Sequence, residues 1–176
     1  MTIRRLALGA LVGGAVLAVA NVLLLIDPGA RALDSGGDVL VEALVVLGIL
    51  LTLAGLIGVH LRQKERYGVL GLIGLVLAVV GQAASISDVF VVDRSLQLVT
   101  TLPATVGLIL LAFAILRAPL LPHWSGFVLL IGFVAFWTLQ DVDFGIALDG
   151  VAWIVVGYAL WSGWAEPAIA MRTQQL

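Results

Sequence analysis

The sequence predicts an all-α integral membrane protein with six transmembrane helices. Of its 176 residues, 62% are hydrophobic and 11% are charged, and the mean hydropathy is +1.18. A soluble domain carries about 25% charged residues. Apolar segments recur between short polar ones, and a segment of about twenty residues is long enough to cross the hydrocarbon core of a bilayer. We therefore expect a single membrane domain over residues 1–176.

The polar interruptions divide the chain into six segments. Residues 27–29 (Asp-Pro-Gly) mark a turn, and Ser95 is expected to cap the fourth helix. Pro103 lies inside that helix, and bilayer helices tolerate such a proline. Four polar residues between positions 140 and 149 crowd the turn of the last hairpin. The expected spans are 6–26, 39–59, 68–92, 96–116, 121–139 and 144–164.

The first segment has an alternative interpretation. Arg4 and Arg5 precede the apolar run, and residues 18–20 (Ala-Val-Ala) resemble a signal-peptidase site. The apolar run continues past that site to Ile26, so we expect a retained first helix.

Basic residues set the expected orientation. The densest run of charge is at residues 62–66, between two apolar segments. If the amino terminus, the 60–67 loop, the 117–123 loop and the tail share one side, seven basic residues lie there and two, Arg31 and Arg94, lie opposite. Basic loops stay cytoplasmic, so both termini are expected inside a cell membrane of the prokaryotic inner-membrane type. The seven are Arg4, Arg5, Arg62, Lys64, Arg66, Arg117 and Arg172.

Two similar segments, 68–74 and 126–132, each follow an aromatic residue and a basic loop. Three tandem helical hairpins would explain the similarity, and chance matching in an Ala/Gly/Leu/Val-rich chain is the alternative.

Several polar residues interrupt the predicted spans. Asp88 shares a helical stripe with Ser85, and Asn21 has a similar setting in the first helix. An ionisable residue within a span generally faces the bundle interior or a wet cavity. We expect a polar cavity at the outer end, lined by Asn21, Glu42, Ser85, Asp88, Gln140 and Asp141. One alternative is hydrogen bonding between helices, at about 0.6 kcal/mol per bond. Another is that the third helix ends before Asp88.

Other ionisable residues have ordinary explanations. The histidines His60 and His123 flank inner loops and are expected beside lipid headgroups rather than as metal or haem ligands. Helices two, four and six begin at the outer side, where acids complement their positive N-terminal ends. Caps or dipole partners are expected at Asp38, Glu42, Asp93, Asp143 and Asp149.

Catalytic signatures are missing from the sequence. There is no cysteine, HExxH, GxSxG, P-loop or GxGxxG. His123 and Ser125 have no nearby carboxylate to complete a triad, and Asp141 and Asp143 form an ordinary turn. We expect no cofactor, no bound metal and, at a net charge of −2, no nucleic-acid partner. No diagnostic family motif is present.

The leading functional hypothesis is a non-enzymatic scaffold or accessory subunit that acts through helix packing in the lipid bilayer, with a second copy or in a larger membrane complex. Small residues spaced by four allow such close packing. The rival is a transporter or channel for a small, cationic solute, with Asp88 central, and a lipid-active enzyme comes third. The small-residue sets are Gly9/Gly13, Ala10/Gly14/Ala18, Ala54/Gly58 and Gly74/Ala78.

Overall fold

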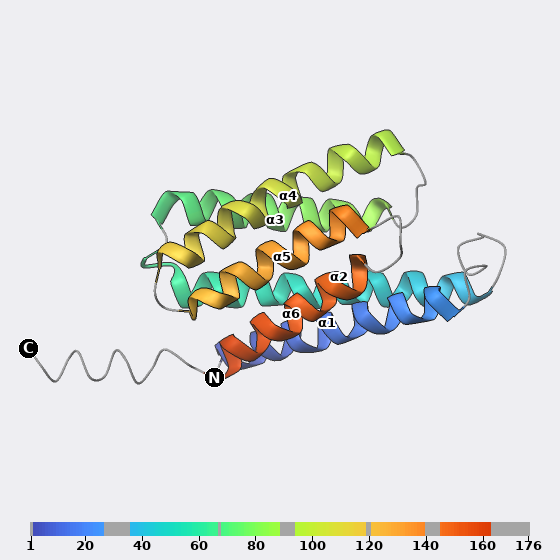
Figure 1. Ribbon diagram of the computed structural model, residues 1–176, viewed down its shortest axis with the longest axis horizontal. Coiled ribbons are helices and arrows are strands. Elements are labelled where there is room, and N and C mark those ends of the chain that lie inside the picture. The colour runs from blue at the N-terminus through green and yellow to red at the C-terminus, as the bar shows by residue number, and fades with distance from the viewer. Residues whose placement is uncertain are drawn as a thin grey trace, which may run out of the picture.

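Within the residues that the computed structural model describes (2–26, 36–66, 68–88, 94–118, 121–139 and 145–162), the chain forms six helices and no strand (Figure 1). This confirms the predicted all-α class. Three of the helices have apolar stretches long enough to cross a membrane, whereas the described apolar stretches of the other three are shorter. The helices are α1 (Thr2–Ile26), α2 (Gly36–Gln63), α3 (Gly68–Asp88), α4 (Arg94–Arg117), α5 (His123–Leu139) and α6 (Gly145–Trp161).

Several helix ends differ from the prediction. The helix α2 continues to Gln63, so His60 and Arg62 belong to its last turn and not to a loop. Gly68 has φ +62°, a left-handed conformation that favours glycine and allows the sharp reversal into α3. Ser95 lies inside α4, so the prediction that it caps this helix is wrong. The third helix is described as far as Asp88, four residues before the expected end.

The six helices form a ring in chain order. Each packs against the next, and α6 returns to pack along α1, so that α1 lies between α2 and α6. The contact of α2 with α3 is the lightest in the ring, and α2 also touches α6 across it. In Figure 1 the pair α3/α4 lies on one side of the bundle and α1/α6 on the other, with α5 between them. Neighbouring helices run antiparallel.

Glycines let the backbone of α1 approach both neighbours. A Cβ atom on Gly13 would lie 2.9 Å from the backbone nitrogen of Thr52 in α2. A Cβ atom on Gly14 would collide with the carbonyl oxygen of Gly150 in α6. Because adjacent residues point about 100° apart on a helix, the two glycines serve different neighbours. Close backbone contact of this kind stabilises helix pairs where lipid surrounds the helices.

Glycines also allow close backbone contact between α3 and α4. A Cβ atom on Gly81 would collide with the backbone of Ala104, and one on Gly107 with the backbone of Ala78. The predicted small-residue faces therefore meet other helices of the same chain. Their glycines contact helices as follows: Gly9 and Gly13 contact α2, Gly14 contacts α6, Gly58 contacts α1 and Gly74 contacts α4.

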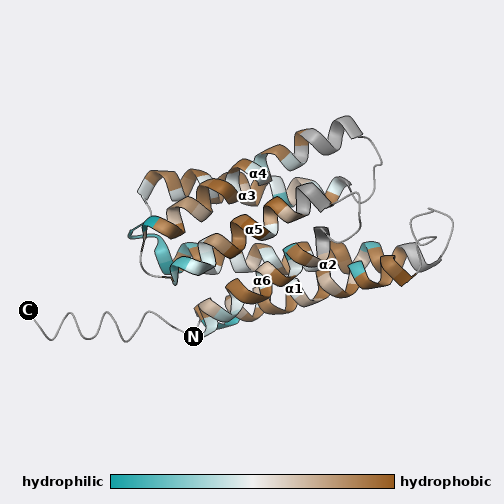
Figure 2. Ribbon diagram, in the orientation of Figure 1, coloured by the Kyte–Doolittle hydropathy of each residue, from teal (hydrophilic) through white to brown (hydrophobic). Residues whose placement is uncertain are grey.

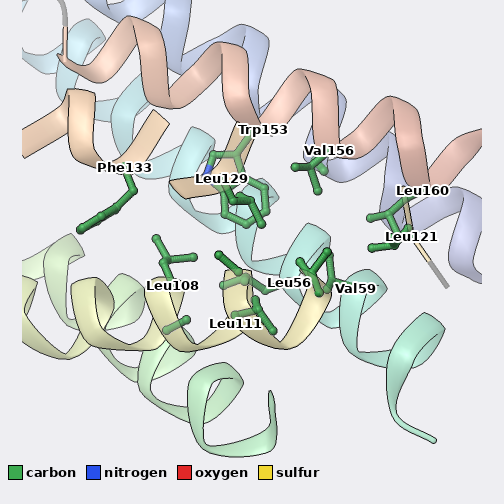
Figure 3. Close-up of a cluster of buried hydrophobic side chains, with 14 of the residues drawn as sticks. Leu56, Val59, Leu108, Leu111, Leu121, Leu129, Phe133, Trp153, Val156 and Leu160 are labelled. Atoms are coloured by element: carbon green, nitrogen blue, oxygen red, sulfur yellow. The ribbon is translucent and has the colours of Figure 1, made fainter. Parts of the chain in front are cut away.

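Large apolar side chains fill the middle of the ring (Figure 3). Trp153 of α6 is fully buried there, with Leu56 of α2 and Leu111 of α4. Phe133 and Leu129 of α5 close the same cluster. The described interior is thus a packed apolar core.

One end of the bundle is basic. Arg4 and Arg5 begin α1, Lys64 and Arg66 follow α2, and Arg117 ends α4; all five are exposed. Alternating helix directions bring these positions together, and the hydrophilic colouring gathers where α2 meets α3 (Figure 2). We call this the basic end. The sides of the helices expose mainly valine, leucine and isoleucine.

The contact of α1 with α6 predicts the effect of a single methyl group. Gly14→Ala should lower the free energy of unfolding by about 1–3 kcal/mol, because the new Cβ forces the two backbones apart. Reversible unfolding in mixed detergent micelles measures the change. Ala15→Val, at an exposed neighbouring position, is the matched control and should have little effect. Equal stability of Gly14→Ala and the parent would contradict the described contact.

Candidate functional site

The interior face of α1 carries a buried amide at its far end. Ala10, Gly14, Leu17 and Asn21 follow one another at intervals of four, three and four residues, so they form one stripe on the helix. All four are buried, and Asn21 is fully buried. The stripe contacts both neighbours, because Ala10 and Leu17 lie against glycines of α2 and Gly14 lies against α6. Asn21 is therefore buried on the side of α1 that packs into the bundle.

Glu42 lies at the same level on the neighbouring helix. Gly48 of α2 contacts Leu17 and Gly13 of α1, and continuing this antiparallel register brings Glu42 level with Asn21. Glu42 is partly buried, and it precedes Ile49, a buried residue, by seven positions on the same stripe. It also lies beyond the first turn of α2, so the prediction that it caps this helix is wrong.

Asp149 is a site residue that the sequence reasoning assigned to a cap. The helix α6 begins at Gly145 and has no acid in its first turn, so Asp149 lies too far inside to bond the free N–H groups of that end. It stands four residues before Trp153 and seven before Val156, and both are fully buried. Asp149 is itself partly buried. The carboxyl thus starts the stripe of α6 that faces the core.

The register with α1 gives the depth of Asp149. Gly150 approaches the backbone at Gly14 and Ala18, so Asp149 lies about one helical turn deeper in the bundle than Asn21. Three helices therefore bring polar groups to the interior near the end opposite the basic end. We call Asn21, Glu42 and Asp149 the interior polar row.

The other predicted cavity residues do not join this row. The hydroxyl of Ser85 donates a hydrogen bond of 2.8 Å to the carbonyl oxygen of Gln82 in its own helix. Its helix, α3, packs mainly against α4, across the bundle from α1. The side chain of Asp88 and the residues Gln140 and Asp141 lie outside the described residues.

A further buried polar group, the indole N–H of Trp153, lies one helical turn nearer the basic end than Asp149. Trp153 is fully buried, and among the described residues its Nε1 hydrogen has no acceptor. The far edge of its ring, at Cζ3, is 3.4 Å from the position that a Cβ atom on Gly55 would take. Nothing in the sequence marks this indole as different from an ordinary core tryptophan.

Other polar groups lie at or near the basic end. Gln63 is fully buried, and among the described residues neither of its amide atoms has a hydrogen-bond partner. Ser125 donates a bond of 2.7 Å to the carbonyl oxygen of Pro122, so its hydroxyl is engaged within its own turn. His60 is partly buried and His123 is exposed. No group of three or more His, Cys, Asp or Glu residues among those described could hold a metal ion.

A groove of about 320 Å³ lies between α1 and α2, and no residue of the interior polar row lines it. Its lining is apolar: Leu11, Val12, Ala15, Val16, Val19 and Leu44. In comparisons with protein-family models, with curated proteins and with solved structures, no match was found.

The position of Asp149 predicts an unusual response to substitution. A carboxyl on the core-facing stripe opposes burial, so Asp149→Leu should raise the free energy of unfolding by roughly 1–3 kcal/mol. A cap or a dipole partner would instead lose stability when it is replaced. Unfolding in mixed micelles distinguishes the two. Glu65→Gln, at an exposed position after α2, is the control and should stay within about 0.5 kcal/mol of the parent.

Proposed function

We propose that the chain is a six-span membrane protein of the cell membrane, with the basic end and both termini on the cytoplasmic side. The exposed arginines and lysine at that end support this orientation, because basic loops are retained in the cytoplasm. The three long apolar helices support a membrane location by their length and composition. The three shorter apolar stretches, Thr101–Arg117, His123–Ala135 and Ala147–Trp161, belong to helices that lie in the same ring.

The orientation can be tested by cysteine labelling, because the chain has no native cysteine. Lys64→Cys should resist a membrane-impermeant maleimide added to intact cells and react after permeabilisation. Ser35→Cys, in the first predicted outer loop, is the matched control and should react in intact cells. Labelling of Lys64→Cys from outside would overturn the orientation.

We further propose that this protein acts as a small scaffold or accessory subunit within the membrane. The observation that carries this proposal is the packed apolar core, in which Trp153, Leu56 and Leu111 occupy the middle of the ring. A packed interior of this kind suits a structural component. The small-residue faces are used within the chain, so a partner would contact the branched apolar side chains of the outer surface.

The helix α3 is the least buried of the three long helices. Only 22% of its most apolar stretch is buried, against 28% in α2 and 39% in α1. Along one face it exposes Val69, Leu72, Ile73, Val76 and Val80.

Partner association predicts a specific crosslinking pattern. A photoreactive residue at Val76, on α3, should crosslink to a protein in native membranes, and the protein should purify at native abundance in mild detergent as a species larger than one chain. The same photoreactive residue at Leu50, exposed on α2 and outside the apolar groove, is the matched control and should mark lipid. A strictly monomeric species without a protein crosslink at Val76 would contradict the scaffold function.

A second function, the binding or passage of a small cation, is favoured by the interior polar row. Acids inside a membrane bundle usually mark an ion or proton path, and Glu42 and Asp149 are both placed toward the interior. The three residues of the row lie within about one helical turn of depth near one end of the bundle, so the row reaches only part of the way across.

A further inference from the structure

The indole of Trp153 points toward the interior polar row. Its Cζ3 atom lies against Gly55, and in an indole ring Cζ3 is across from the carbon that carries Nε1. Gly55 lies nearer the basic end than the level of Trp153, so Nε1 is directed the other way. Figure 3 agrees, because the ring nitrogen lies on the side of Phe133. Gly132, beside Phe133, packs against Leu148 and Ala152, which places that side level with Asp149.

The charges of this half of the bundle are all negative among the described side chains. The half of α1, α2, α5 and α6 farther from the basic end includes Glu42 and Asp149, and no described Lys, Arg or His side chain lies there. A carboxylate inside a bundle requires a counter-charge or a proton. An indole N–H without an acceptor is also costly when it is buried. One species that brings both a positive charge and an acceptor oxygen would satisfy the two groups together.

We infer that Asp149, Asn21 and Trp153 form a binding site for a monovalent metal cation carrying water, such as hydrated Na⁺ or K⁺. The Asp149 carboxylate and the amide oxygen of Asn21 supply the oxygen atoms that hard cations prefer. A water molecule on the cation accepts the hydrogen bond from Nε1 of Trp153. Glu42, one turn nearer the end of the bundle, adds negative charge at the approach to the site.

The charge of the ligand follows from the number of acids. Sites for divalent cations gather several carboxylates, whereas no cluster of three such groups occurs among the described residues. Asp149 is the only described acid at its depth, and one carboxylate balances one positive charge. The inference deepens the second function above and does not depend on which side of the membrane the basic end faces.

Nuclear magnetic resonance of the full chain in detergent micelles tests the site directly. The chain has five tryptophans, so ¹⁵N-tryptophan labelling gives five indole signals, and Trp153→Phe assigns the signal of Trp153. Titration with NaCl or KCl, against choline chloride at constant ionic strength, should shift that signal saturably. Titration from pH 8 to pH 5 without either ion separates protonation from binding of a metal cation.

Asp149→Asn should abolish the shift, whereas Glu65→Gln should leave it unchanged. The Asn variant is nearly isosteric, and the wild-type titration stands by itself if that variant does not fold. A Trp153 signal that shifts with neither Na⁺ nor K⁺ would overturn the inference even if it shifts with pH, as would an unchanged response in Asp149→Asn. Neither result bears on the scaffold function, which the crosslinking experiment decides separately.

Discussion

Backbone contact between α1 and its two neighbours is the constraint on which the rest of the fold depends. Where lipid surrounds a helix bundle, burying leucine between helices gains little, and close van der Waals contact between backbones becomes the main source of stability. Gly13 opens one face of α1 to α2 and Gly14 opens the next face to α6. With α1 fixed between these helices, the first and last helices of the chain are joined and the ring closes.

Ring closure decides what each helix face can do. The stripes that point inward carry Trp153, Leu56 and Leu111 and fill the centre. The faces with small residues contact other helices of the same chain. What remains for lipid, or for another protein, is a surface of branched apolar side chains such as Val76 and Ile73 on α3. The same packing that gives the bundle its shape therefore moves any partner contact away from the small-residue faces.

The interior polar row is the exception to this apolar plan. Asn21 is fully buried, and Asp149 begins the stripe that continues through Trp153. Groups of this kind oppose membrane insertion, so a sequence that needed only a packed core would place leucine or valine there. The polar groups of the row come from three different helices, and the indole N–H of Trp153 is directed toward them from the side of the basic end. Packing alone does not explain this arrangement.

The sequence was sufficient for the all-α class and for the six helices of the described residues, because the spacing of the apolar runs predicts helices of about this length. It also indicated that Asn21 is not an ordinary surface residue, because a lone amide interrupts an apolar stripe, and Asn21 is fully buried in the structure. It was not sufficient for helix ends: Ser95 looked like a cap because its local chemistry suits one, whereas α4 begins at Arg94. Nor could it separate a cap from an interior carboxyl at Asp149, because that depends on where α6 begins and on the rotation of α6 against α1. The sequence also did not determine which helices pack against one another. Glycines in every helix make many pairings sterically acceptable, and only the assembled bundle selects Gly14 against Gly150 and turns Trp153 and Asp149 toward the same interior.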